Sequence, residues 1–208
     1  MKIIRPPAPD FLVDRSEHWG KQFQRRRKEN IAARFNWPQY NGTRINLLLL
    51  PTLMAMTSLL RTEDNAHCSF CDGFPVTPVS ADSIEHFRPK STFPLLVCTW
   101  NNLFYCCSKC QESKGEDFDE SLLNPDFDEY SFEHYFQYDT ETGNVLPNPD
   151  RLENDLYDFQ RAEKTIELYG LNDYGRPQAR KRTIRQFTSM GNPILDEFPY
   201  RFILSYLQ

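Results

Sequence analysis

The spacing of hydrophobic and polar residues divides the chain into segments of different character. Residues 14–35 place apolar side chains at helical intervals among many charged ones, which predicts a basic amphipathic helix. Residues 45–60 are mostly apolar but are interrupted by Asn46, Pro51 and other polar positions, so they predict a buried helix or helix pair. This stretch is too short and too interrupted to cross a bilayer core of ~30 Å.

The second half of the chain carries a hairpin signal followed by two helical patterns. Turn-forming residues 140–144 stand between two short runs of aromatic and branched side chains, which predicts an antiparallel hairpin. Apolar residues at helical spacing predict further helices over 155–169 and 177–190. The side chains that flank the predicted turn are Tyr135, Phe136, Tyr138, Val145 and Leu146.

These patterns predict an α+β fold in which a mostly helical chain carries a small, loop-rich module with short strands. The expected parts are an N-terminal helical segment over 1–62, a central module over 63–118 and a C-terminal part over 119–208. A helix is expected to begin near Cys107, inside the central module. No flexible linker separates the parts, so the C-terminal hairpin and helices are expected to pack on the module, and the N-terminal segment is a candidate for partner binding.

Charge is distributed unevenly along the chain, although the net charge is only −5. Residues 1–65 carry an excess of +5, residues 116–160 an excess of −13, and residues 161–190 an excess of +4. Such blocks suggest separate surfaces for separate partners, with an ordinary solvated surface as the alternative.

Composition and the first residues favour a folded protein of the cytoplasm. Hydrophobic residues make up 39% of the chain and aromatic residues 14%, as is typical of globular proteins. Residues 1–7 contain no apolar run of the kind found in a signal peptide. We therefore expect a soluble, cytoplasmic protein with no membrane contact.

Four of the six cysteines form two Cys-x-x-Cys pairs, Cys68 with Cys71 and Cys107 with Cys110. Two thiolates two residues apart can reach one ion because the intervening turn folds back, and Gly73 favours such a turn. Four thiolates complete the tetrahedral shell of Zn²⁺, so the spacing predicts a structural zinc knuckle. The alternatives are four buried free cysteines or an iron–sulfur cluster. The two remaining cysteines are expected in the core: Cys98 and Cys106.

Residues suited to hydrolytic chemistry lie between the two cysteine pairs. Glu85 directly precedes His86, and successive side chains of a strand point to opposite faces, so one can hold a cation while the other faces a water. Hydrolysis of a phosphodiester needs a base to activate water and a cation to neutralise the developing charge. For a histidine taken alone, an ordinary structural role is the alternative.

The order of these residues resembles the HNH endonuclease motif, whose ββα-metal fold surrounds one divalent ion. The resemblance implies an HNH module stabilised by the zinc knuckle. It also implies that His86 is the general base, that Glu85 is a metal ligand and that Asn102 orients the histidine loop. The family's third position, usually Asn or His, falls on Gln111, which is therefore the second expected ligand of Mg²⁺ or Mn²⁺. The segments that carry the resemblance are Glu85-His86, Asn101-Asn102-Leu103 and Cys107 to Lys114.

Gln111 departs from the family pattern. Its amide oxygen can coordinate magnesium, but the extra methylene moves that oxygen outward, and Glu112 or a water could compensate. Basic side chains around the expected site are candidates for phosphate contacts, which position a backbone without reading its sequence. The expected substrate-binding residues are Arg88, Lys90 and Lys114, with Lys109 nearby.

Further segments occur in the same order in one HNH group, the PtuB-type nucleases of bacterial Septu anti-phage defence and of some retron systems. The resemblance implies a partner ATPase of the PtuA type, related to ABC and SMC-like ATPases, and a nucleic-acid substrate. In retron versions it also implies a reverse transcriptase and its RNA–DNA product. The matching segments outside the HNH core are residues 4–7 with Pro9 and Leu12, residues 122–125, and residues 165–172.

Two functions remain in competition. The first is a metal-dependent endonuclease acting in an anti-phage system, with DNA favoured over RNA although the motif engages phosphates rather than the 2′-hydroxyl. The second is a catalytically weak or inactive zinc module that binds nucleic acid or tethers a partner. Glu85 and His86 beside two basic residues favour the enzyme, whereas Gln111 favours the alternative.

Overall fold

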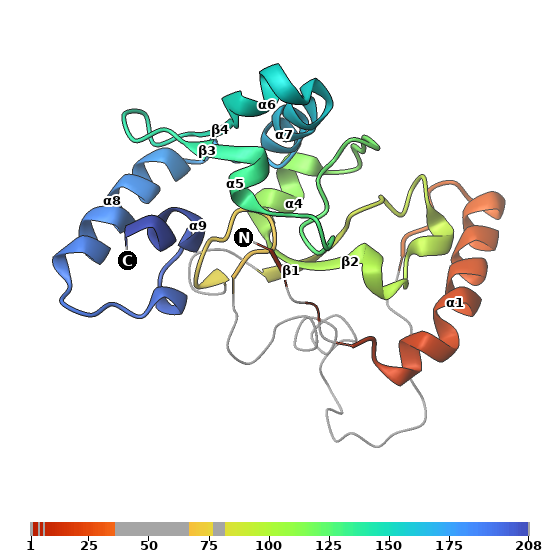
Figure 1. The fold of residues 1–208 in the computed structure, drawn as a ribbon. Coiled ribbons are helices and arrows are strands. Elements are labelled where there is room, and N and C mark those ends of the chain that lie inside the picture. The colour runs from red at the N-terminus through yellow and green to blue at the C-terminus, as the bar shows by residue number, and fades with distance from the viewer. Residues whose placement is uncertain (1, 4, 6, 36–66, 77–81, 208) are drawn as a thin grey trace.

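The structure, a computed structural model, describes residues 2, 3, 5, 7–35, 67–76 and 82–207 (Figure 1). The apolar helix or helix pair predicted over 45–60 lies outside these residues. None of the described helices combines the length and apolar character that crossing a membrane requires.

An antiparallel hairpin followed by a helix forms the centre of the molecule. Strand β1 (Asp82–His86) pairs with β2 (Leu103–Cys107), and the chain turns directly from β2 into α4 (Ser108–Lys114). The register places Glu85 opposite Phe104 and His86 opposite Leu103. The predicted helix beginning near Cys107 is therefore confirmed. Cys110, the second cysteine of this pair, lies in its first turn.

Helix α1 (Asp10–Glu29) packs on one side of this hairpin. Leu12 and Phe23 of α1 are buried together with Ile84 of β1 and Leu103 of β2, which explains the apolar spacing seen in this segment. The helix begins four residues before the predicted position, after Pro9, and ends where Asn30 adopts an extended conformation. Its last turn carries three basic residues, which interact favourably with the negative end of the helix dipole.

Gly20 allows α1 to approach the short helix η1 (Pro94–Leu96). A Cβ atom on Gly20 would lie 2.3 Å from the carbonyl oxygen of Leu95, so no larger residue fits without movement of the backbone. The chain between η1 and β2 continues through η2 (Trp100–Asn102). This close contact fixes α1 against the loop that joins the two strands.

The C-terminal part contains the predicted hairpin and both predicted helices. Strand β3 (Phe136–Tyr138) pairs antiparallel with β4 (Val145–Pro147), and Asp155 caps the first predicted helix. The observed helices, α7 and α8, differ from the predicted limits by one residue at each end. The helices of this part are α5 (Phe132–Tyr135), α6 (Pro149–Asn154), α7 (Leu156–Leu168), α8 (Arg176–Ser189) and α9 (Arg201–Leu204), with the short helices η3 (Leu195–Glu197) and η4 (Ser205–Leu207).

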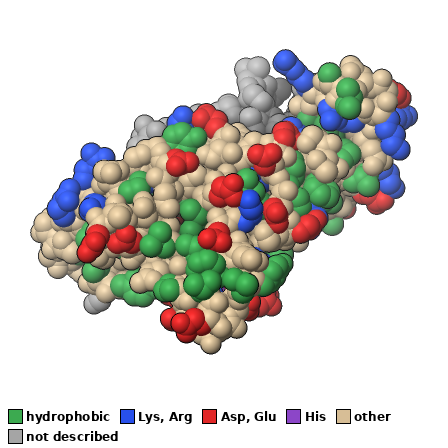
Figure 2. Space-filling view, turned by 90° about the horizontal axis from the view of Figure 1, so that it is seen from above, with side chains coloured by type: hydrophobic (Ala, Val, Ile, Leu, Met, Phe, Trp, Pro, Cys, Tyr) green, Lys and Arg blue, Asp and Glu red, His purple; other side chains and the backbone are tan. Residues whose placement is uncertain are grey.

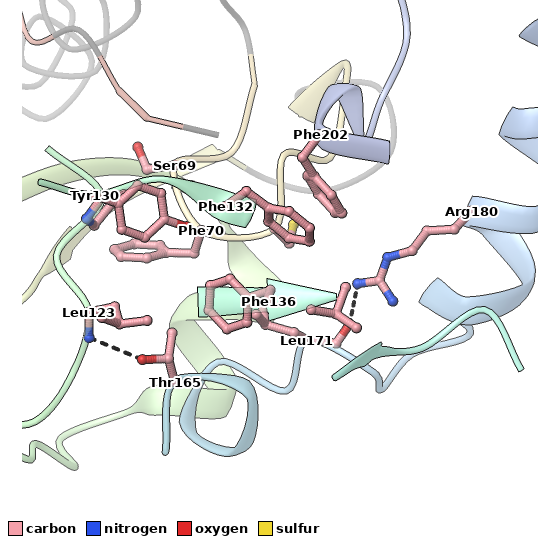
Figure 3. A pocket seen from close by; sticks show the side chains of 13 residues that line it. Ser69, Phe70, Leu123, Tyr130, Phe132, Phe136, Thr165, Leu171, Arg180 and Phe202 are labelled. Carbon is pink, nitrogen blue, oxygen red and sulfur yellow. Dashed lines mark hydrogen bonds between the residues drawn. The ribbon is translucent and has the colours of Figure 1, made fainter. Parts of the chain in front are cut away.

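Aromatic side chains fill the space between the first cysteine loop and the C-terminal elements (Figure 3). Phe132 stacks on Phe202 with ring centroids 4.2 Å apart, and Phe70 stacks on Tyr169 at 3.9 Å. The cavity among these rings has a volume of only about 20 Å³, which suits one water molecule rather than a ligand. This region is therefore a packed core that joins the cysteine loop to α7 and α9.

Candidate functional site

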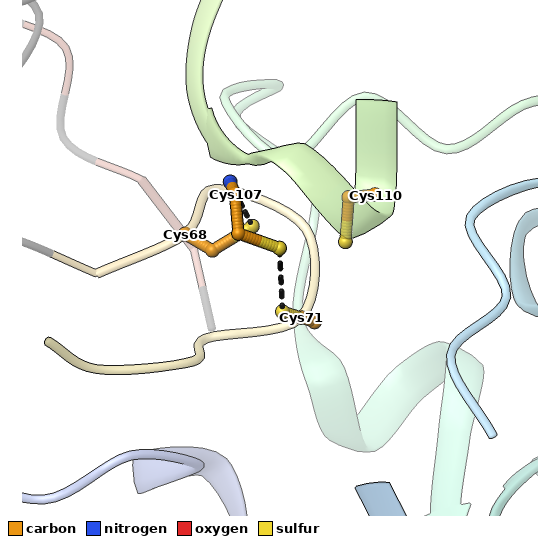
Figure 4. A group of neighbouring side chains, drawn as sticks. All are labelled: Cys68, Cys71, Cys107 and Cys110. Carbon is orange, nitrogen blue, oxygen red and sulfur yellow. Dashed lines mark hydrogen bonds between the residues drawn. The ribbon is translucent and has the colours of Figure 1, made fainter. Parts of the chain in front are cut away.

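The four cysteines of the two Cys-x-x-Cys pairs lie together in the interior (Figure 4). Cys68 and Cys71 come from the loop before β1, whereas Cys107 ends β2 and Cys110 lies in α4. Their Sγ atoms all lie within 4.8 Å of one another, and none of the six cysteines forms a disulfide. The predicted grouping of these four thiols is confirmed.

The donor set fits a zinc ion. Zn–S bonds of about 2.3 Å in a tetrahedron separate the sulfurs by about 3.8 Å, and the Sγ atoms of Cys71 and Cys107 lie 3.8 Å apart. Hydrogen bonds from the neighbouring thiols, that of Cys110 first, lower the pKa of Cys107, so the cluster already favours a thiolate. Four buried thiols form a closed, structural site, since a complete tetrahedron leaves no position for substrate.

The turn after the first cysteine pair depends on Asp72 rather than on the predicted Gly73. Asp72 has a φ of 53°, in the left-handed region that aspartate tolerates better than most residues. Its carboxylate receives Arg201 Nη2 at 2.7 Å and the backbone N–H of Arg201 at 2.6 Å. His67 Nδ1 lies 3.2 Å from the same carboxylate. The first residue of α9 therefore holds the cysteine turn in place.

Arg176, in the first turn of α8, contacts the cysteine cluster from outside. Its Nη2 donates to Cys110 Sγ at 3.3 Å and to Cys107 Sγ at 3.7 Å, and its Nη1 donates to the carbonyl oxygen of Tyr169. The pKa of Arg176 is raised because the cysteine charges outweigh the opposing effect of burial. The guanidinium would thus compensate the negative charge that four thiolates bound to a metal ion would place in the interior.

The two cysteines outside these pairs are buried in the core, as predicted. Cys98 and Cys106 each expose 0% of their surface. Burial raises the pKa of Cys98 to about 12 and that of Cys106 well above its ordinary value. Both therefore stay protonated and behave as small apolar side chains.

His86 ends β1 and lies against Val97, directly after η1, and Phe35, beyond the end of α1. Its Nε2 lies 3.0 Å from the carbonyl oxygen of Val97, and its ring meets that of Phe35 edge-on at 5.9 Å. A carbonyl can only accept, so the N–H of the neutral ring is on Nε2 and the lone pair is on Nδ1. Burial lowers the pKa of His86 to about 4, with the charge of Lys90 acting in the same direction. The imidazole is therefore neutral at physiological pH.

Glu85 points to the opposite side of the hairpin, where it meets Lys114 of α4. Lys114 Nζ donates to Glu85 Oε1 at 2.6 Å and to the carbonyl oxygen of His86 at 3.1 Å. Burial raises the pKa of Glu85 to about 7, although the nearby ammonium opposes this shift. Lys114 exposes 0% of its surface, so its ammonium cannot reach a substrate phosphate in this structure, in contrast to the expectation from sequence.

Asn102 connects the start of β2 to the loop after His86. Its Nδ2 donates to the carbonyl oxygens of Arg88 and Leu96, and its Oδ1 accepts the backbone N–H of Arg88 at 2.7 Å. The side chain thus bonds to both ends of the segment between β1 and η1. A buried amide with three such partners holds a loop in one conformation.

Gln111 lies in α4 beside the hairpin. Its Nε2 donates to the carbonyl oxygen of Ile84 at 2.8 Å, so the amide is anchored to the residue just before Glu85. The amide oxygen and the Glu85 carboxylate are hard ligands of the kind that Mg²⁺ and Mn²⁺ prefer.

Arg88 and Lys90, the other expected phosphate contacts, are paired with acidic residues. Both ends of the Arg88 guanidinium bond to Glu120, at 2.9 and 2.7 Å. Lys90 Nζ lies 3.4 Å from Glu116, and Ser91 Oγ donates to the same carboxylate. The segment after α4 therefore neutralises both of these cations.

Sequence reasoning missed the residues that support this site from a distance. Arg176 and Arg201 lie more than 60 residues from the cysteines that they stabilise, in segments without a metal motif. For Arg176 the sequence signal is the basic character of residues 161–190, which does not say which arginine is buried, and Arg201 lies outside that segment.

Comparisons with known proteins give a partial relationship. No protein-family model matches the chain. Over 66 residues the chain is 35% identical to the Septu protein PtuB of Bacillus thuringiensis. The match covers 31% of this chain and 26% of that protein, so the matched part spans about a quarter of the relative's length. This similarity supports a relationship between the chain and Septu-type proteins.

Proposed function

We propose that this chain is a metal-dependent HNH-type endonuclease that hydrolyses phosphodiester bonds, DNA in the first place, as a component of a Septu-type anti-phage system. The observation that carries the proposal is the arrangement of β1, β2 and α4. It places Glu85 and His86 at the end of the hairpin, with Asn102 bonded to the loop that follows. The partial similarity to PtuB supports the defence role and a PtuA-type ATPase as partner.

In this proposal His86 takes the proton from the attacking water. Its low pKa keeps the ring neutral, and the Val97 carbonyl holds the N–H on Nε2, so Nδ1 is the basic atom. Asn102 positions the loop, and through it the imidazole. The role of Asn102 is therefore positional rather than chemical.

Glu85 and Gln111 are the residues that would hold the divalent cation. A cation bound there would neutralise charge on the phosphate and on the leaving oxygen. Lys114 has a different role from the expected phosphate contact. It anchors the Glu85 carboxylate and the His86 carbonyl from within the core.

The test is Mn²⁺- or Mg²⁺-dependent cleavage of plasmid DNA and of total RNA by the purified protein, with and without its ATPase. His86→Ala is expected to lower the cleavage rate by about 10²–10⁴-fold while zinc content and fold are kept. His134→Ala, at a histidine of α5 that pairs with Asp158 of α7, is the matched control and is expected to cut normally. Undiminished cleavage by His86→Ala would exclude the general-base role.

The alternative, a catalytically weak zinc module that binds nucleic acid or a partner, is favoured by the Lys114 ammonium, which already neutralises Glu85. It predicts no metal-dependent cleavage by the wild type under any of these conditions, together with normal zinc content. Cleavage that depends on His86 would rule it out.

A further inference from the structure

Among the residues that the structure describes, the cations around His86 leave little positive charge for a polyanionic substrate. Arg88 is neutralised by Glu120, Lys90 by Glu116, and Lys114 is buried against Glu85. A nuclease must nevertheless offset the repulsion between its own negative charge and the phosphates, and Lys and Arg contacts supply most of that attraction. The charge must therefore come from another surface close to the site.

The C-terminal half of α1 is such a surface. It presents consecutive basic residues whose charges are little neutralised by acidic side chains. Arg25 is 78% exposed, and its ion pair with Glu29 is long, at 3.9 Å. In the described part of the chain, Arg26, Arg27 and Lys28 form no ion pair. We define this basic surface as the α1 patch: Arg25, Arg26, Arg27 and Lys28. Lys21, one turn earlier, is paired with Glu17 at 2.5 Å and is not part of it.

The α1 patch is connected to His86 by a short series of aromatic contacts. The guanidinium of Arg26 lies 5.9 Å from the ring of Phe23, Phe23 meets Phe35 at 5.2 Å, and Phe35 meets His86 at 5.9 Å. The same helix packs on η1, directly before the carbonyl of Val97 that holds the imidazole. A phosphate bound at Arg26 would thus be separated from the proposed base by two aromatic side chains, Phe23 and Phe35.

We propose that the α1 patch is the nucleic-acid docking surface of this protein, contacting the phosphates of a duplex and leading one strand to His86. This inference rests on the proposed function in taking nucleic acid as the substrate, but it concerns binding and not cleavage. Such contacts position the backbone without selecting a sequence.

A second basic surface provides a matched comparison. Basic side chains gather at both ends of the molecule, one group over α1 and the other over α8 (Figure 2). On α8 the exposed members are Arg182 and Arg185, on the helix whose first turn holds the cysteine cluster. General attraction to any basic surface would involve both groups, whereas the proposal assigns binding to α1 alone.

The experiment measures binding of a fluorescein-labelled 30-base-pair DNA duplex by the full chain, without added divalent cation, over a series of salt concentrations. The test variant is Arg25→Gln/Arg26→Gln/Lys28→Gln, because glutamine keeps the helix propensity while removing charge. The control variant is Arg182→Gln/Arg185→Gln. Circular dichroism and zinc content show that each variant is folded, and Arg26→Gln/Lys28→Gln replaces the triple variant if that one is unstable.

The α1 variant is expected to bind at least about tenfold more weakly and to lose about two to three units of the slope of log K against log salt. The α8 variant is expected to bind within about twofold of the wild type. Equal loss in both variants, unchanged binding in the α1 variant, or no duplex binding by the wild type would each overturn the proposal. An α1 variant that binds DNA normally but no longer binds the ATPase would assign the patch to an acidic protein partner instead.

Failure of this inference is distinguishable from failure of the proposed function. A wild-type protein that binds duplex through α1 but never cleaves would contradict the nuclease and leave the docking surface in place. Cleavage that depends on His86, together with normal duplex binding by the α1 variant, would support the nuclease and contradict the docking surface.

Discussion

At the scale of single residues, Glu85 and His86 show how neighbours in sequence acquire different chemistry. The strand points them to opposite sides, so Glu85 meets a buried ammonium and His86 meets a carbonyl and aromatic rings. Burial moves both pKa values, upward for Glu85 to about 7 and downward for His86 to about 4, because it disfavours the charged form of each. Both groups therefore titrate outside their ordinary ranges.

The low pKa of His86 predicts a pH-dependent contribution to stability. The unfolded chain, with an ordinary histidine pKa of 6.5, binds more protons than the folded one between about pH 4 and 6.5, so this contribution falls as the pH falls. The stability advantage of the wild type over His86→Gln is expected to shrink by roughly 2 kcal/mol between pH 7.5 and pH 5. Urea unfolding of zinc-loaded protein measures this.

The comparison with the variant is needed because Glu85 acts in the opposite direction. Its raised pKa makes the folded state bind more protons between about pH 4.5 and 7, a contribution that is lost as the pH rises through that range. Wild type and His86→Gln share that effect, so it cancels in their difference. A difference that stays constant with pH would contradict the assignment of a buried neutral imidazole.

At the scale of elements, the hairpin between α1 and α4 depends on one close approach at Gly20. Alanine there would place Cβ 2.3 Å from the Leu95 carbonyl oxygen, so α1 must move away from η1. Gly20→Ala is expected to lower the free energy of unfolding by about 1–3 kcal/mol, as overpacking does elsewhere. Gly191→Ala is the control, since no atom lies within 4 Å of its added Cβ and its φ is ordinary. Equal stability of the two variants would show that α1 is not held by this contact.

Some of these elements could be predicted from the sequence, whereas the contacts between them could not. The helices over 155–169 and 177–190, the hairpin at 140–144 and the helix after Cys107 follow from local periodicity and turn residues, and the structure confirms them. The close approach at Gly20 does not follow from the sequence, since periodicity does not say what a helix packs against. The acidic partners of Arg88 and Lys90 were hidden for the same reason, because they reach these cations only through the fold.

Arg176 connects α8 to the cysteine cluster and supplies a prediction for that element. Arg176→Met keeps the side-chain length but removes the N–H donors to Cys107 and Cys110, and is expected to weaken zinc affinity by about 10–100-fold. Competition with a colorimetric chelator measures the affinity. Arg180→Met is the matched control, because that arginine is also buried on the same helix but donates to Leu171, Asn172 and Gly143. Similar losses in both variants would mean that Arg176 acts through general stability only.

At the scale of the whole molecule, the cysteine cluster joins parts of the chain that share no sequence signal. Asp72 ties the first cysteine turn to α9, Arg176 ties the second pair to α8, and Phe70 of the first turn stacks on Tyr169 at the end of α7. Residues of the expected middle and C-terminal parts thus meet around the four thiols. An ion bound there would stabilise more than its own loops.

Zinc removal is therefore expected to loosen both parts together. Structural zinc contributes on the order of 10 kcal/mol of apparent folding energy, which exceeds the stability of a typical small domain. Elemental analysis is expected to give one zinc per chain, and Cys68→Ser or Cys110→Ser to lose it. After chelation, hydrogen exchange is expected to accelerate in α8 and α9 as well as around the cysteines, because Arg176 and Arg201 lose the arrangement that holds them. Faster exchange confined to residues 67–76 and 107–110 would show that the ion stabilises only the segments that carry the cysteines. Purified protein without zinc would contradict the zinc site itself.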